Sequence, residues 1–189
     1  MTFIKKGARI LGIAESFEKD REKSILVGIV YRVDGIIDGF TYTEAEVGGL
    51  DATDKIIDLY KELGREDINY IMISGVVISL YNVIDLHHIY YTLGIPIISI
   101  TYEESEGLVN YFMEKFPRDW HKRLLIYFKN GERKKVLLSN GHHIFIRHIG
   151  ISEREAYRLV DKATLEGKYP EPIRVARLIA RRLRSKLYE

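Results

Sequence analysis

The order of secondary-structure patterns along the chain constrains its fold more than any other feature. Three strand-like runs come first: a short apolar run, a β-branched run and an alternating run. Asp34-Gly35 joins the second to the third with a dipeptide typical of two-residue β-hairpins. A helix–strand–helix–strand series follows, which is the pattern of parallel strands joined by crossover helices. The expected strands are 9–14, 24–33, 36–47, 70–74 and 96–102, and the expected helices between them are 51–63 and 82–93.

The chain is therefore expected to be an α/β protein with a mixed sheet, in which three antiparallel strands precede parallel strands and helices flank the sheet. This order of elements is the one found in ribonuclease H-like folds. Helices are also expected at 103–116, at 152–166 and from Pro170 onward, and a strand pair at 136–138 and 143–148, while 118–129 fits no single pattern. No linker interrupts the chain, so residues 1–189 are expected to form one domain with a helical extension from about residue 150.

Composition excludes several classes of protein. Lys+Arg 29 and Asp+Glu 27 give a formal net charge of +2, so any affinity for nucleic acid requires a local basic patch. The chain has no Cys, which excludes disulfides, thiol nucleophiles and Cys-based zinc sites. It shows neither a signal-peptide pattern nor an apolar run long enough to span a membrane, so a cytoplasmic protein without a membrane partner is expected.

Several segments resemble a known archaeal family in both order and spacing. They include KKGARILGIAESF, VGGLDAT, ISGVVISLYNVIDL, GISEREAYRLVDKATLEG and PEPIRVARLIA. The resemblance covers roughly residues 5–183 and is to the family called domain of unknown function ninety-nine, which is related to endonuclease V. It implies a ribonuclease H-like nuclease that cuts deaminated, deoxyuridine-containing DNA. It also implies Mg²⁺ or Mn²⁺ as cofactor, because carboxylates at strand ends would hold such an ion beside the phosphate.

This chain departs from the family pattern at three acidic positions, which here are Ala14, Gly48 and Ser74. Three acids remain at motif positions, and the resemblance implies that they are the catalytic residues and metal ligands: Glu15, Asp51 and Asp85. Ala14 and Glu15 point to opposite faces of a regular strand. Glu15 is therefore expected to replace the acid missing at position 14 only if the strand ends or bulges there.

Other residues are candidates for binding nucleic acid. Asn82 and Asp85 are three residues apart, which places them on one face of the helix expected there, with Tyr81 beside them. The last helix carries a basic stripe that can follow a phosphate backbone, formed by Arg174, Arg177, Arg181 and Arg184. An aromatic side chain can stack on a base, and the candidates are Phe17, close after Glu15, and Tyr81, next to Asn82. The structural alternatives are a buried Asn82, a solvated arginine face and aromatic side chains in the core.

Three hypotheses follow. The first is a metal-dependent endonuclease with partly degenerate catalytic acids, acting on deoxyuridine-containing DNA. The second is a catalytically inactive homologue that still binds nucleic acid. The third is a protein-interaction or dimerisation module in which the C-terminal helices pair with a second copy.

Overall fold

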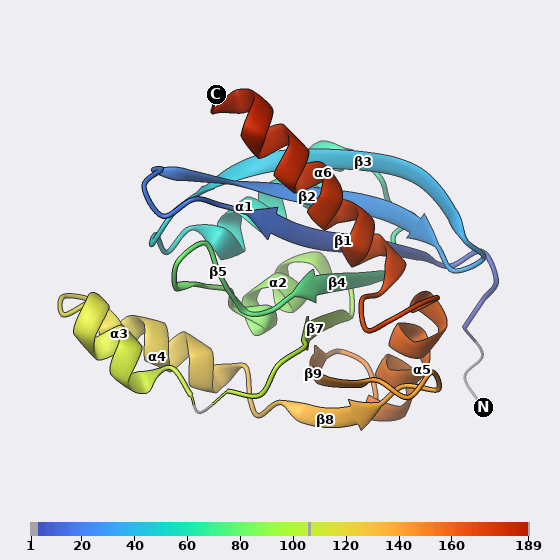
Figure 1. Ribbon diagram of the computed structural model, residues 1–189. Helices are drawn as coiled ribbons and strands as arrows, with labels where there is room; N and C mark the ends of the chain where they lie inside the picture. The colour runs from blue at the N-terminus through green and yellow to red at the C-terminus, as the bar shows by residue number, and fades with distance from the viewer. Residues whose placement is uncertain (1–3, 106, 189) are drawn as a thin grey trace.

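The computed structural model describes residues 4–105 and 107–188, and its centre is a seven-stranded sheet (Figure 1). In spatial order the strands are β3 (Ile36–Glu46), β2 (Lys23–Arg32), β1 (Arg9–Ser16), β4 (Tyr70–Ser74), β7 (Ile97–Thr101), β9 (His143–Ile149) and β8 (Lys134–Leu137). The first three strands pair antiparallel, and β1, β4 and β7 run parallel to one another. The expected mixed sheet is confirmed, and an antiparallel pair, β9 and β8, extends it beyond β7.

Helices cover both faces of this sheet because its central strands are apolar on both sides. One face packs against α1 (Ala52–Leu63) and α2 (Leu86–Leu93), and the other against α5 (Glu153–Ala163) and α6 (Glu171–Leu187). Side chains of β1 alternate between the two layers: Leu11 and Ile13 join the α1 side, while Ile10 and Ala14 join the α6 side. This alternation decides later which side chains of β1 meet at the site.

The segment before α2 differs from the expected helix 82–93. It forms a small hairpin of β5 (Val77–Ile78) and β6 (Asn82–Val83), and the helix begins only at Leu86. Asp85 is the N-cap of that helix, because its Oδ1 accepts a hydrogen bond from the His88 backbone N–H at 2.9 Å. The expectation that Asn82 and Asp85 share a helix face is therefore wrong.

Two short helices form a separate layer beside the hairpin. They are α3 (Val109–Lys115) and α4 (Trp120–Lys129), so the expected helix 103–116 is present only in its second half, and the undecided segment is mostly helical. Phe112 and Leu124 from these helices enclose Val83 of the hairpin in a third apolar cluster. Within the described ranges, no helix has the length and apolar character needed to cross a lipid bilayer.

The contact between β1 and the start of α6 requires a glycine. A Cβ built on Gly12 would lie 2.3 Å from Pro172 Cβ and 2.7 Å from the Pro172 carbonyl carbon. Because backbone is among the clashing atoms, the helix cannot stay in place over β1 if position 12 carries a side chain.

We expect Gly12→Ala to lower the free energy of unfolding by about 3 kcal/mol, because α6 must shift away from β1. Urea unfolding followed by circular dichroism measures this change. Gly7→Ala is the matched control, since a Cβ at Gly7 meets nothing within 4 Å, and we expect it to change stability by less than about 0.5 kcal/mol. Equal effects of the two substitutions would contradict the proposed packing.

Candidate functional site

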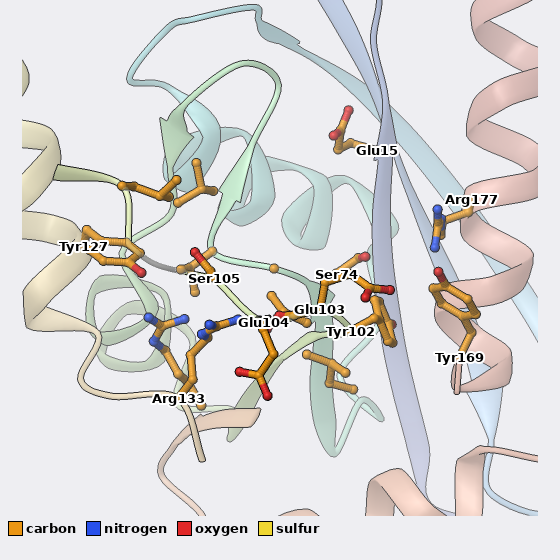
Figure 2. Close-up of a pocket in the computed structure, with 17 residues that line it drawn as sticks. Glu15, Ser74, Tyr102, Glu103, Glu104, Ser105, Tyr127, Arg133, Tyr169 and Arg177 are labelled. Carbon is orange, nitrogen blue, oxygen red and sulfur yellow. Dashed lines mark hydrogen bonds between the residues drawn. The ribbon is translucent and has the colours of Figure 1, made fainter. Parts of the chain in front are cut away.

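A cavity of about 430 Å³ opens where the parallel strands β1, β4 and β7 end, between the sheet, α6 and the α4–β8 connection. The carboxyl ends of parallel strands are the usual position of ligand sites in open α/β sheets. Half of its polar lining residues are arginines and tyrosines, and the others are glutamates and hydroxyl side chains: Arg133, Arg147, Arg177, Tyr102, Tyr127 and Tyr169 form the first half, and Glu15, Glu103, Glu104, Ser74, Thr101 and Ser105 the second. Glu15 and Ser74 line the cavity at the strand ends (Figure 2).

Glu15 lies on the opposite face of β1 from Ala14. The ladder between β1 and β2 is continuous here, pairing Ala14 with Val27 and Glu15 with Leu26, so no bulge turns the side chain of Glu15 toward α6. Its Oε1 lies 3.5 Å from the backbone nitrogen of Ser79, and its Oε2 is buried without a partner in the described part of the chain. Burial raises the pKa of Glu15 to about 6. Glu15 therefore does not fill the place of the missing acid.

An arginine faces the side that the missing acids would have faced. Ala14 and Met72 pack in the α6 layer, and Ser74, two residues after Met72 on β4, points to the same side. Arg177 of α6 lies on that side with its Cζ 4.6 Å from the centre of the Tyr169 ring. Figure 2 shows Arg177 and Glu15 on opposite sides of β1.

Asp51 and Asn82 form a hydrogen-bonded support for the start of α1. Asn82 is fully buried; its Nδ2 donates to Asp51 Oδ1 at 2.7 Å and to the Glu46 carbonyl at 2.9 Å. Its Oδ1 accepts from the Ala52 backbone N–H at 3.1 Å. Asp51 also accepts from the Glu46 backbone N–H at 3.1 Å. The structural alternative for Asn82, a buried amide bonded to backbone, accounts for two of its three hydrogen bonds, and the third is to the Asp51 carboxylate.

Asp85 takes part in a different network, on the side of α4. Its Oδ2 accepts from Lys129 Nζ at 2.7 Å, in addition to the helix-capping bond of Oδ1. Burial alone would raise the pKa of Asp85, but the hydrogen bond from Lys129 and the capping bond outweigh it, so the pKa lies below its ordinary value.

The three retained acids thus have separate partners. Across residues 4–105 and 107–188, no group of three or more His, Cys, Asp or Glu side chains is placed to hold a metal ion. A magnesium centre of this kind needs several hard oxygen ligands around one ion. The donor set near Glu15 does not fit such a centre, and the metal role of Glu15, Asp51 and Asp85 stays a prediction.

The other predicted binding residues also have defined contacts. The Tyr81 ring packs against Phe112 and Phe116 with centroids 5.7 and 5.8 Å apart, so that ring belongs to the α3–α4 cluster. The carbonyl of Phe17, directly after β1, accepts a hydrogen bond from Arg184 at 3.0 Å.

The arginine stripe of α6 is divided by its ion pairs. Arg184 also lies 3.3 Å from Glu18, and Arg174 pairs with Glu171 of its own helix at 2.6 Å. Arg177 faces the cavity, and it also lines a shallow groove of about 250 Å³ along α6 together with Arg181.

Three arginines that the sequence patterns do not single out shape the site. Arg123 is 2% exposed and donates to the carbonyls of Gly48, Gly49 and Tyr81 at 2.7–2.8 Å. It thereby holds the hairpin, in which residues 79–81 all have positive φ, against the loop after β3. Arg133 and Arg147 line the cavity. The one sequence signal is at Arg147, a charge in the middle of the apolar strand HIFIRHI.

We expect Asn82→Ala to lower the free energy of unfolding by about 2–4 kcal/mol, because it leaves the Ala52 N–H, the Glu46 carbonyl and Asp51 without their partner. Asn69→Ala is the control: Asn69 is exposed and accepts one bond, from the Arg9 N–H, so a change below about 1 kcal/mol is expected. Urea unfolding measures both variants. An Asn82→Ala variant as stable as the control would show that the amide has no structural role.

The pKa of Glu15 also predicts how stability depends on pH. The folded protein has a pKa of about 6 where the unfolded chain has 4.5, so the folded state binds the proton more tightly. Stability is therefore lost as pH rises from about 4.5 to about 6, by about 2 kcal/mol in total. We expect Glu15→Gln to remove this loss, so that the variant is more stable than the wild type at pH 7 and about equal to it at pH 4. Urea unfolding at several pH values measures this difference, and Glu22→Gln, at an exposed position, is the control. If the stability of wild type and of Glu15→Gln changed with pH in the same way, the raised pKa of Glu15 would be contradicted.

Comparison with known proteins shows which family this chain is similar to. The family model for endonuclease dU matches residues 6–184. A UPF0215 protein from Pyrobaculum calidifontis is 35% identical over 177 residues, which is 94% of this chain and 97% of the relative. A solved protein of unknown function from Archaeoglobus fulgidus aligns with a TM-score of 0.81 at 30% identity, covering 93% of this chain and 98% of that one.

More distant structures show the fold. Endonuclease V from Ciona intestinalis, in complex with a 24mer DNA containing an inosine followed by a ribo-adenosine, aligns with a TM-score of 0.65 at 15% identity, over 96% of this chain and 87% of that one. The fold is thus ribonuclease H-like, as the order of elements predicts, and endonuclease V shares this fold. With a family model matched from residue 6 to residue 184, the chain belongs to the endonuclease dU family.

Proposed function

We propose that this protein binds deoxyuridine-containing DNA in the cavity at the strand ends, and that it binds the backbone through arginine side chains. The family match and the endonuclease V fold support a nuclease-related role. The single observation that carries the proposal is the position of Arg177, whose guanidinium faces the side of the sheet where Ala14 and Ser74 replace the acids implied by the family resemblance.

A guanidinium attracts phosphate directly, whereas a carboxylate attracts it only through a bound cation. With Ala14 and Ser74 at the strand ends, no carboxylate from these positions opposes Arg177. Glu15 lies across β1; burial raises its pKa to about 6 although the charge of Arg177 lowers it, so this carboxylate is mostly ionised at pH 7 but on the other face of the strand. The α6 side of the cavity is therefore suited to an anion without a metal ion.

Aromatic groups beside Arg177 provide a surface for a base. The rings of Tyr102 and Tyr169 lie 4.2 Å apart, and Arg177 stacks on Tyr169. The Tyr102 hydroxyl is buried and has no hydrogen-bond partner among the described residues. A nucleotide in the cavity would supply the missing partner, because buried hydroxyls are normally hydrogen-bonded.

The second candidate function is hydrolysis of the same DNA with Mg²⁺ or Mn²⁺, by the partly degenerate acid set Glu15, Asp51 and Asp85. The family match favours it, and so does the unpartnered Oε2 of Glu15 at the edge of the cavity. The separate partners of Asp51 and Asp85 count against it.

Binding and cleavage are measured on one labelled duplex with a single deoxyuridine and on the same duplex with thymine. We expect anisotropy to report tighter binding of the deoxyuridine duplex, weakening as salt is added. We expect Arg177→Gln to weaken binding about tenfold, corresponding to one lost charge-assisted phosphate contact. Arg182→Gln is the matched control, because Arg182 is exposed on the same helix outside the cavity, and its loss is expected to have little effect.

Denaturing gels of the same mixtures with Mg²⁺ or Mn²⁺ separate the two candidates. Binding without cleavage supports the binding function alone. Cleavage that is lost in Glu15→Gln, Asp51→Asn or Asp85→Asn supports the hydrolytic function and its predicted residues. Absence of any binding, or equal binding by wild type and Arg177→Gln, overturns the proposal.

A further inference from the structure

Two further arginines lie across the cavity from Arg177, and neither is used by the site described so far. Arg147 lies within β9 and is only 6% exposed. Arg133 directly precedes β8, and Figure 2 shows it across the cavity from Arg177. Arg147 Nε donates to the Gly131 carbonyl at 2.7 Å. One terminal nitrogen of Arg133 donates to Thr101 Oγ1 at 3.2 Å and to the Glu103 carbonyl at 3.0 Å. Neutral oxygens thus fix the direction of both side chains, and these bonds use only one nitrogen of each guanidinium.

Among the residues that the structure describes, no acid pairs with either arginine. Within residues 4–105 and 107–188, neither guanidinium has a carboxylate oxygen within 4 Å. The two cavity-lining glutamates beside them pair with lysines instead, Glu103 with Lys168 and Glu104 with Lys135. Arg147 has an aromatic contact, since its Cζ lies 5.1 Å from the centre of the Tyr127 ring.

Two like charges near one another in a partly buried place oppose folding. Burial lowers the pKa of Arg147, the interaction with the Tyr127 hydroxyl raises it in part, and the nearby charge of Arg133 lowers it again. Proteins bury an arginine when it is paired, and the guanidinium fork fits phosphate oxygens through parallel N–H bonds. An anion between the two side chains would relieve the repulsion and use the remaining N–H groups at the same time.

We propose that Arg133 and Arg147 form a phosphate-binding site on the β9 side of the cavity. For a DNA ligand this inference rests on the proposed function, and it assigns to the pair a backbone phosphate other than the one held by Arg177. The shared chemistry is a phosphate group, whether it belongs to DNA or is free in solution.

The first experiment uses inorganic phosphate alone. Thermal unfolding of the wild type is followed against phosphate concentration, with sodium chloride at matched ionic strength as the reference. We expect a saturable rise in Tm for the wild type, and affinities about tenfold weaker for Arg133→Gln and Arg147→Gln. Lys134→Gln is the matched control: it removes one positive charge from the adjacent residue of β8, which is exposed and does not line this cavity, so a wild-type response is expected.

Circular dichroism first establishes that each variant is folded. Arg147 also ties β9 to Gly131, so Arg147→Gln can unfold the protein for a structural reason. In that case Arg133→Gln carries the test, because Arg133 is half-buried and lies outside the strand. The inference is overturned if phosphate acts no more strongly than chloride, or if Arg133→Gln responds as Lys134→Gln does.

The second experiment distinguishes a DNA phosphate from a free one. The deoxyuridine duplex is titrated into wild type, Arg133→Gln and Lys134→Gln, and we expect about tenfold weaker binding for Arg133→Gln alone. Phosphate binding without DNA binding would retain the Arg133–Arg147 site and overturn the proposed function. DNA binding that Arg133→Gln leaves unchanged would overturn the assignment of a backbone phosphate to this pair while leaving Arg177 in its role.

Discussion

The regular pairing of β1 is the constraint on which the site depends. This strand is hydrogen-bonded to β2 over its whole length, antiparallel, and to β4 over its first half, parallel, so it cannot rotate or slip by one residue without breaking the ladder on both sides. Its side chains must therefore alternate between the two helical layers. An acid at position 15 instead of position 14 therefore projects from the opposite face of the sheet. Sequence proximity to a missing acid is consequently no substitute for that acid.

A second consequence follows from how α6 lies on β1. The helix begins at a point where Gly12 lets the Pro172 backbone approach closely, and this contact fixes the start of the helix over the centre of the sheet. From that start, positions 176 and 180 face the sheet, and Arg177, next to Ala176, is directed along its edge toward the cavity. The helix has about 3.6 residues per turn, so a glycine and a proline at one end determine where a charge lies about one and a half turns later. The packing of Gly12 against Pro172 thus determines where the positive charge of Arg177 lies relative to the cavity.

Sequence patterns predict the layers of this fold well because the layers depend on long, repeated signals. The apolar runs of the first two strands, the alternation of the third and the apolar stripe of α1 each involve several residues, so single exceptions do not change the outcome. The segment around Asn82 is different: three consecutive residues with positive φ precede it, and none of them is glycine. That conformation is held by Arg123 of α4, which is more than forty residues away from Tyr81, so no local pattern could predict it. The candidate site was predictable only in part for the same reason, since Arg133 and Arg147 reach the cavity through tertiary contacts.

The distribution of charge around the cavity favours phosphate binding by arginine side chains in place of phosphate binding through a metal ion held by carboxylates. When strand-end carboxylates are present, a phosphate is repelled until a cation neutralises them. Here Ala14 and Ser74 remove that repulsion from the α6 side, and Glu15 projects from the other face of β1. Arg177 on one side and the pair Arg133 and Arg147 on the other then supply permanent positive charge. Because a guanidinium keeps its proton at any physiological pH, such a site attracts phosphate without depending on a metal ion.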